Sequence, residues 1–173
     1  MIRLPTIEHV PGLAERLAAD VVCAERVTVK AVVQRGGQLW LLHSLVWDCY
    51  KFPGGGVEGS ESYADTLARE LREEAGAELR GVGPQLLTVT ELSAAQEKEA
   101  DVFRMTSHYY ACELGTNWRA PQPEAYEQAL GLVPVWVTPG TAAQANALAL
   151  ARPGAPRWLR RELKVLRALA GQL

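Results

Sequence analysis

The chain has 173 residues, 48% of them hydrophobic and 22% charged, with a formal net charge of −2 at pH 7. This composition is typical of a folded globular domain and excludes a disordered or fibrous chain. The near-neutral charge, without a long basic run, argues against binding to long nucleic acids, and no apolar stretch is long enough to span a bilayer. Three dispersed cysteines and no leader-like N-terminal segment favour a cytoplasmic protein.

The first third of the sequence predicts an arm followed by a strand pair. Residues 1–25 form the arm, with a short helical pattern at 13–21. The β-branched segment 27–33 predicts a strand, and the turn signal Arg35-Gly36-Gly37-Gln38 predicts that it returns along 39–46. We therefore expect an antiparallel hairpin near the centre of a sheet.

A glycine-rich loop at residues 53–60 precedes a helix expected over 62–75. Ser62 and Asp65 have the spacing of a capping box at the helix start, and Gly76 suits the position just after its end. The boundaries of this helix are therefore the best specified in the chain.

The remaining sequence alternates between strands, loops and helices. The expected elements are strands at 85–91, 103–114 and 133–137, loops at 93–101 and 117–125, and helices at 138–150 and 158–169 with a breaker at 152–156. Strands with helices on either side predict an α/β sandwich with a mixed sheet. We expect one domain over residues 1–173, in which 1–25 is an N-terminal arm and 151–173 a C-terminal helix.

Three carboxylates of the helix at 62–75 share one face. Glu70, Glu73 and Glu74 fall within an arc of about 100°, and we expect that face to point to solvent. The residues expected to pack on the sheet lie on another arc: Ala64, Leu67, Ala68, Leu71 and Ala75. An ordinary surface helix would intersperse opposite charges, whereas clustered carboxylates are stabilised by a cation. Oxygen ligands without nearby histidine or cysteine favour Mg²⁺ or Mn²⁺.

The loop before the helix adds backbone groups to this site. Gly55 and Gly56 allow the main chain to approach a ligand closely. Glu61 lies just before the helix and is placed to reach the same metal. Arg69 precedes Glu73 by four residues, which is close enough to orient it through an ion pair.

The stretch resembles the Nudix box: glycine, five residues, glutamate, seven residues, then Arg-Glu-aliphatic-any-Glu-Glu-any-Gly-aliphatic. The matching residues are Gly55, Glu61, Arg69, Glu70, Leu71, Glu73, Glu74 and Gly76. Seven fixed positions match by chance about 10⁻⁵ times over a chain of this length. The departure is Ala77, where the family has a larger aliphatic residue. Phe52-Pro53-Gly54-Gly55 and Val135-Trp136-Val137 are also similar to family segments.

The resemblance implies a Nudix-like α/β/α sandwich over about residues 26–150 and a hydrolase that cleaves a pyrophosphate linkage. It implies that Glu70, Glu73 and Glu74 hold one or more Mg²⁺ ions with a backbone carbonyl of Gly54 or Gly55. Arg69 then orients the carboxylates and Glu61 supports the site. The implied substrate is a nucleoside triphosphate, a nucleotide sugar, ADP-ribose or a dinucleoside polyphosphate.

Hydrolysis also needs a general base, and the sequence leaves its identity open. The base is either a box glutamate or an acidic residue of a later loop, where the candidates are Glu97, Glu99, Glu124 and Glu127. We favour Glu127, because its loop precedes the strand with Trp136, although a surface carboxylate is the ordinary alternative.

Aromatic and basic residues add further candidates for substrate contact. Tyr50 and Phe52, like Trp47, stand just before the glycine loop and either stack on a base of the substrate or pack in the core. The basic run on the last helix, which comprises Arg157, Arg160, Arg161 and Lys164, is typically a solvated face, with phosphate support or a dimer contact as alternatives.

Two other functions stay open at this level. A non-catalytic Nudix module that binds a nucleotide for regulation would typically have lost box carboxylates, and this chain keeps them. An isomerase on the same fold would need an acid–base pair, for which only Cys49 is available. We therefore expect an enzyme whose partner is a small phosphorylated metabolite, not a membrane, with a homodimer left open.

Overall fold

The strands of the computed structural model, which describes residues 1–19, 21–96 and 99–171, form two sheets. Sheet A contains β1 (Ile2–Arg3), β2 (Ile7–Glu8), β3 (Cys23–Val32), β7 (Ala77–Ala94) and β8 (Val102–Trp118). Sheet B contains β4 (Gln34–Arg35), β5 (Gln38–Ser44), β6 (Cys49–Lys51) and β9 (Leu132–Val137). Sheet A is mixed, because β8 pairs antiparallel with β7 and parallel with β3.

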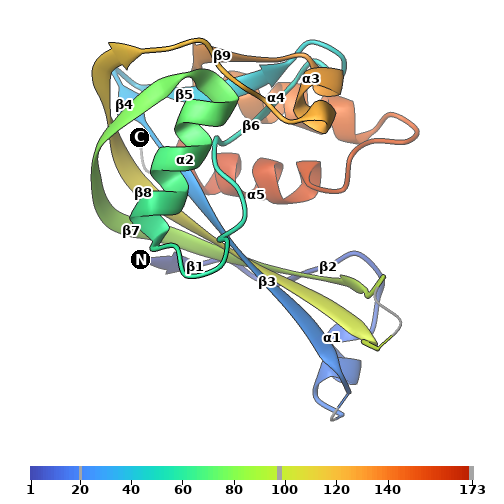
Figure 1. The fold of residues 1–173 in the computed structure, drawn as a ribbon. Coiled ribbons are helices and arrows are strands. Elements are labelled where there is room, and N and C mark those ends of the chain that lie inside the picture. Colours follow the sequence, from blue (N-terminus) through green and yellow to red (C-terminus); the bar gives the residue numbers. More distant parts are fainter. Residues whose placement is uncertain (20, 97–98, 172–173) are drawn as a thin grey trace.

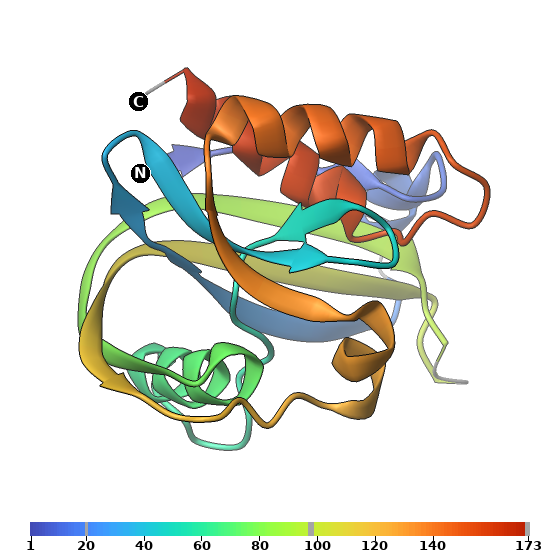
Figure 2. The ribbon, with the colours of Figure 1, turned by 90° about the horizontal axis from the view of Figure 1, so that it is seen from above.

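Helices cover the strands from two sides. They are α1 (Leu13–Leu17), α2 (Tyr63–Ala75), α3 (Ala125–Leu130), α4 (Pro139–Leu150) and α5 (Leu159–Ala170). Figure 1 shows the long strands of sheet A crossing behind α2, and Figure 2 shows α2 on the side opposite to α4 and α5. This arrangement confirms the predicted α/β/α sandwich.

The helix that carries the glutamates begins and ends where its sequence predicts. The Ser62 side chain accepts from the Asp65 amide, and the Asp65 carboxylate accepts from the Ser62 amide, which completes the capping box. Gly76 ends the helix with φ +66°. A Cβ there would lie 1.9 Å from the Arg119 carbonyl oxygen, so only glycine fits.

The predicted hairpin of residues 27–33 and 39–46 forms only beside its turn, where the Trp40 amide donates to the Val33 carbonyl at 2.9 Å. Its continuation along β3 is wrong. β3 pairs in parallel with β8 instead, from Cys23 opposite Val102 to Val32 opposite Ala111. The Gly36-Gly37 turn joins β5 to the two-residue strand β4. A turn signal specifies local reversal, whereas the partner of a strand buried on both faces is chosen by packing over long range.

Several elements are longer or more integrated than the sequence suggests. β7 and β8 extend well beyond the predicted strands, and the unpredicted helix α3 begins at the last residue of the predicted loop at 117–125. The arm at residues 1–25 is not peripheral, because β1 and β2 both pair in parallel with β7. In the part of the chain that the structure describes, no helix has the length and apolarity needed to cross a membrane.

Candidate active site

The glycine-rich loop is an added edge strand of sheet A. The Ala31 amide donates to the Pro53 carbonyl at 2.9 Å, and the Val57 amide donates to the Val27 carbonyl at 3.1 Å, so the loop runs antiparallel to β3. Glycine at position 54 has φ +122°, and a Cβ there would lie 2.2 Å from a backbone oxygen of β3. The loop therefore fits against the sheet only with its glycines.

The two loop carbonyls predicted as ligands have different surroundings. The Gly55 carbonyl accepts from the Val29 amide at 2.9 Å and is part of the sheet. The Gly54 carbonyl instead accepts from the Lys30 ammonium. The Gly54 oxygen already contacts a cation, whereas the Gly55 oxygen is used by the sheet. Gly54 is therefore the more suitable metal ligand.

Glu74 is tied to this loop. Its side chain accepts from the Gly54 amide and from Lys51 Nζ, both at 2.6 Å, and the residue is 3% exposed. Burial raises the pKa of Glu74 to about 7, although the positive charges of Lys51 and Lys30 oppose the shift. The expectation that the glutamate face points to solvent is therefore wrong for Glu74, because the loop folds over that end of the helix.

The other two box glutamates lie nearer the surface. The side-chain exposures are 13% for Glu70 and 37% for Glu73. Burial raises the pKa of Glu70, while the hydrogen bond from Arg69 works in the opposite direction. A Cβ on Gly55 would lie 2.2 Å from Glu70 Oε1, so the carboxylate rests directly against the loop backbone.

Arg69 binds the site together. Its guanidinium donates to Glu61 Oε1 and Glu70 Oε1 at 2.8 Å, to Glu73 Oε2 at 3.2 Å and to the Gly56 carbonyl at 3.0 Å. One planar side chain thus links the helix, the loop and the residue that precedes the helix. This is the geometry expected of an orienting residue.

The carboxylate of Glu61 is fully engaged. Its two oxygens accept from Arg69 at 2.8 and 3.1 Å, and Oε2 also accepts from the Thr66 hydroxyl and the Glu58 amide. The Arg69 hydrogen bond, with the Thr66 and Glu58 donors, lowers the pKa of Glu61 to about 2. A carboxylate saturated in this way fixes Arg69 and has little capacity left for a metal.

Lys51 and Glu127 extend the cluster beyond the box. Lys51 Nζ lies 3.3 Å from Glu127 Oε1 in addition to its contact with Glu74, and the Tyr126 hydroxyl donates to the same Glu127 oxygen at 2.9 Å. Burial would lower the pKa of Lys51, but the charge of Glu74 outweighs it and the net shift is upward. Glu127 lies in the first turn of α3 and is 3% exposed.

The remaining predicted residues lie elsewhere. Phe52 is fully buried and packs edge-to-face on Tyr109 at 5.3 Å between ring centroids, so it belongs to the core and offers no face to a substrate. Tyr50 stacks on His43 at 4.7 Å. Of the other base candidates, Glu99 and Glu124 are exposed and Glu97 lies outside the described residues.

The chemistry of the donor set fits a hard divalent cation. Glu70, Glu73, Glu74 and the Gly54 carbonyl supply only oxygen atoms, and two lysine ammonium groups already mark this region as attractive to positive charge. Within the described residues, no three His, Cys, Asp or Glu side chains converge as they stand into a metal-binding group. Arg69 and Lys51 occupy their oxygens, so ion binding requires these cations to shift.

Sequence reasoning missed the cations of β3. Arg26, Thr28 and Lys30 alternate along the strand, and alternating residues share one face of a strand. That spacing was available as a signal, because polar residues with a period of two interrupt an otherwise β-branched run. Lys51 had no such signal, since its partners come from α2 and α3.

The comparisons with known proteins agree with this geometry. The NUDIX domain family model matches residues 24–161, so the chain belongs to the Nudix family, and the prediction of a Nudix pyrophosphohydrolase is confirmed. The comparison with curated proteins gave no match.

Solved structures show the same fold at low sequence identity. The solution structure of the E. coli ORF135 protein has a TM-score of 0.50 and 24% identity, over 85% of this chain and 94% of that one. A NUDIX hydrolase from Nitrosomonas europaea has a TM-score of 0.52 and 14% identity, over 82% and 89%. A MutT protein from Bacillus halodurans has a TM-score of 0.53 and 14% identity, over 84% and 82%. These likenesses concern the fold alone.

Proposed function

We propose that the protein hydrolyses the pyrophosphate linkage of a nucleoside diphosphate joined to another group, with Mg²⁺ or Mn²⁺ bound by Glu70, Glu73, Glu74 and the Gly54 carbonyl. The observation that carries the proposal is the contact of α2 with the loop. Glu70 lies against the Gly55 backbone, and Glu74 accepts from the Gly54 amide, so the carboxylates and the loop backbone form one oxygen-rich surface.

Some residues of the chain would hold the metal ion, and one would accept a proton. When bound, the metal would supply positive charge to the pyrophosphate oxygens and lower the pKa of a water. Arg69 fixes Glu73 through Oε2, and Oε1 of Glu73 has no hydrogen-bond partner among the described residues. If Arg69 shifts on ion binding, Oε2 would be available to the metal, and Glu73 Oε1 is our choice for accepting the proton of the attacking water.

Glu127 has a supporting role in this proposal. Its carboxylate is buried and accepts from Lys51 and Tyr126, so it holds Lys51 beside Glu74 rather than facing a water. The substrate remains a small phosphorylated metabolite, and the cytoplasmic location stays a prediction.

The test is the variant Glu73→Gln, assayed against nucleoside triphosphates, nucleotide sugars, ADP-ribose and dinucleoside polyphosphates with anion-exchange separation of the products. We expect wild type to turn over at least one compound with Mg²⁺, and the variant to lose about 10²- to 10⁴-fold in rate. The control is Glu113→Gln, which changes an exposed glutamate of β8. Unfolding curves of both variants check that the fold is kept.

Two outcomes would contradict the proposal in different ways. Full activity in Glu73→Gln would remove that residue from the mechanism and put the metal site in doubt. Nucleotide binding without turnover of any compound by wild type would favour the regulatory module instead.

A further inference from the structure

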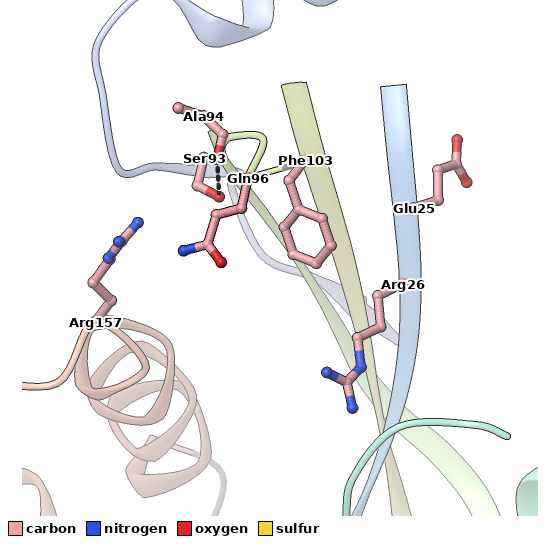
Figure 3. A pocket seen from close by; sticks show the side chains of 7 residues that line it. All are labelled: Glu25, Arg26, Ser93, Ala94, Gln96, Phe103 and Arg157. Atoms are coloured by element: carbon pink, nitrogen blue, oxygen red, sulfur yellow. Dashed lines mark hydrogen bonds between the residues drawn. The ribbon is translucent and has the colours of Figure 1, made fainter. Parts of the chain in front are cut away.

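A pocket of about 440 Å³ lies between sheet A and the start of α5. Figure 3 shows Arg26 of β3 and Arg157 extending from opposite walls, with the Phe103 ring of β8 between them. Ser93 and Gln96 add polar side chains to the lining. The volume is in the range of pockets that bind small molecules.

The pocket carries two guanidinium groups that form no ion pair with a described residue. Arg26 and Arg157 are both exposed, and no described carboxylate forms an ion pair with either. The one carboxylate in the lining, Glu25, pairs with Arg104. Exposed guanidinium groups that line a pocket from opposite sides can each bind a phosphate.

Arg26 connects the pocket to the glycine loop of the candidate active site. A Cβ on Gly56 would lie 2.5 Å from Nη2 of Arg26, so this guanidinium rests against the glycine loop. Arg26, Thr28 and Lys30 follow one another on the same face of β3, and Lys30 reaches the Gly54 carbonyl. At about 3.3 Å per residue, Arg26 and Lys30 are about 13 Å apart along the strand, a span on the scale of a nucleotide.

The far wall suggests a second anionic group. Arg157 also borders another hollow whose lining includes Arg152, Arg160 and His9. Positive charge therefore continues on the side of the pocket that faces away from Arg26. Between the two walls, the half-buried ring of Phe103 offers a surface on which a planar base can stack.

We propose that this Arg26–Phe103–Arg157 pocket binds a nucleoside that carries a second phosphate in addition to the pyrophosphate to be cleaved. The base stacks on Phe103, Arg26 binds the phosphate attached to the nucleoside at the active-site side, and Arg157 binds the second phosphate on the ribose. The substrate class is thus a nucleoside diphosphate derivative phosphorylated at the 2′ or 3′ position. This inference rests on the proposed function for the position of the pyrophosphate.

Equilibrium binding in EDTA, measured by calorimetry, tests the pocket without metal or turnover. The probes are AMP, adenosine 2′,5′-bisphosphate, adenosine 3′,5′-bisphosphate and ribose 5-phosphate. We expect wild type to bind at least one bisphosphate at least tenfold more tightly than AMP. Arg157→Ala should abolish that preference and leave AMP binding unchanged. Arg167→Ala, which changes an exposed arginine of the following helix α5, should leave both unchanged.

Phe103→Ala provides the second measurement. It should weaken AMP binding by about tenfold, in line with the free energy of base stacking on an aromatic residue, and leave ribose 5-phosphate binding unchanged. Equal affinities of wild type for AMP and both bisphosphates, no binding of any probe, or an unchanged preference in Arg157→Ala would each overturn the proposal. A bisphosphate preference that persists in a protein without turnover would keep this pocket and reject the hydrolase mechanism.

Discussion

The ammonium of Lys51 is enclosed by negative groups and an aromatic ring. It contacts Glu74 at 2.6 Å and Glu127 at 3.3 Å, and it lies 5.6 Å from the centroid of the Tyr126 ring. With this cation in place, two buried carboxylates from α2 and α3 can stay close together. Lys51 thereby links the box helix to a helix that follows it by about fifty residues.

Replacement of Lys51 by methionine should therefore be costly. The change leaves Glu74 and Glu127 buried without their shared cation, and loss of one partner of a buried ion pair costs about 3–5 kcal/mol. Urea unfolding measures the loss. Lys164→Met is the control, because the Lys164 ammonium donates to the exposed Pro5 carbonyl and forms no ion pair with a residue that the structure describes. Equal stability of the two variants would show that the enclosed cation contributes nothing to the fold.

At the scale of residues, the sequence predicted the box and missed its surroundings. Arg69 and the glutamates follow from spacing along one helix, which fixes their mutual positions. The burial of Glu74 does not follow, because it depends on how the loop folds over the helix. Lys30 and Lys51 were missed for the same reason: their contacts join segments that are far apart in the chain.

The C-terminal helix α5 supports the loop through charged residues. Arg161 donates to Glu91 of β7 at 2.6 Å and to Glu162 at 2.9 Å, and Glu162 accepts from the Phe52 amide at 3.0 Å. The predicted solvated basic face is therefore wrong for Arg161, which is 6% exposed. The helix fixes the residue that leads directly into the glycine loop.

Glu162→Ala tests this link at the level of the element. The variant leaves the Phe52 amide without an acceptor and Arg161 with one buried partner fewer, and we expect a loss of about 3–5 kcal/mol in unfolding free energy. Hydrogen exchange at the Phe52 amide should also accelerate relative to wild type. Arg167→Ala serves as the control on the same helix. Unchanged exchange at Phe52 in the glutamate variant would mean that α5 does not hold the loop.

Helices were easier to predict than strand pairings for a physical reason. The ends of α2 are specified by local caps at Ser62 and Gly76, and α4 begins directly after Thr138, whose hydroxyl accepts from the Thr141 amide. The pairing of β3 with β8 has no local signature, since no residue pattern near Val33 indicates that the chain passes there from one sheet to the other.

Buried cysteines give a measure of the whole molecule's integrity. Cys49 and Cys112 are 0% and 7% exposed, and burial raises the pKa of each thiol to about 12. At pH 8 the thiolate fraction of such a group is about 10⁻⁴. Cys23 is only half-buried.

We therefore expect iodoacetamide at pH 8 to label the native protein at Cys23 alone and the unfolded protein at all three cysteines. Mass spectrometry of the tryptic peptides distinguishes the sites. Rapid labelling of Cys49 or Cys112 under native conditions would show that the core opens far more readily than its packing implies. Stability should also fall as pH rises above about 9, because the unfolded thiols lose protons that the folded ones retain.

The architecture as a whole extends beyond the matched family region. The family model begins at residue 24, yet β1 and β2 pair with β7 before that point. The sequence therefore predicted the layers correctly and left the role of the arm open, because two-residue strands have no periodicity to detect. The single-domain interpretation of residues 1–173 stays a prediction.

The glycine loop docks on an edge whose other partner is made much later during synthesis. Thr28 of β3 donates to Ser107 of β8, which lies 79 positions later in the chain. The Phe52 amide donates to Glu162 of α5, which lies 110 positions after Phe52. A nascent chain that has released the loop and α2 from the ribosome still lacks the strand and the helix that hold them. Activity should therefore appear only when α5 has emerged from the ribosome. The Nudix box is synthesised early but reaches its active conformation late.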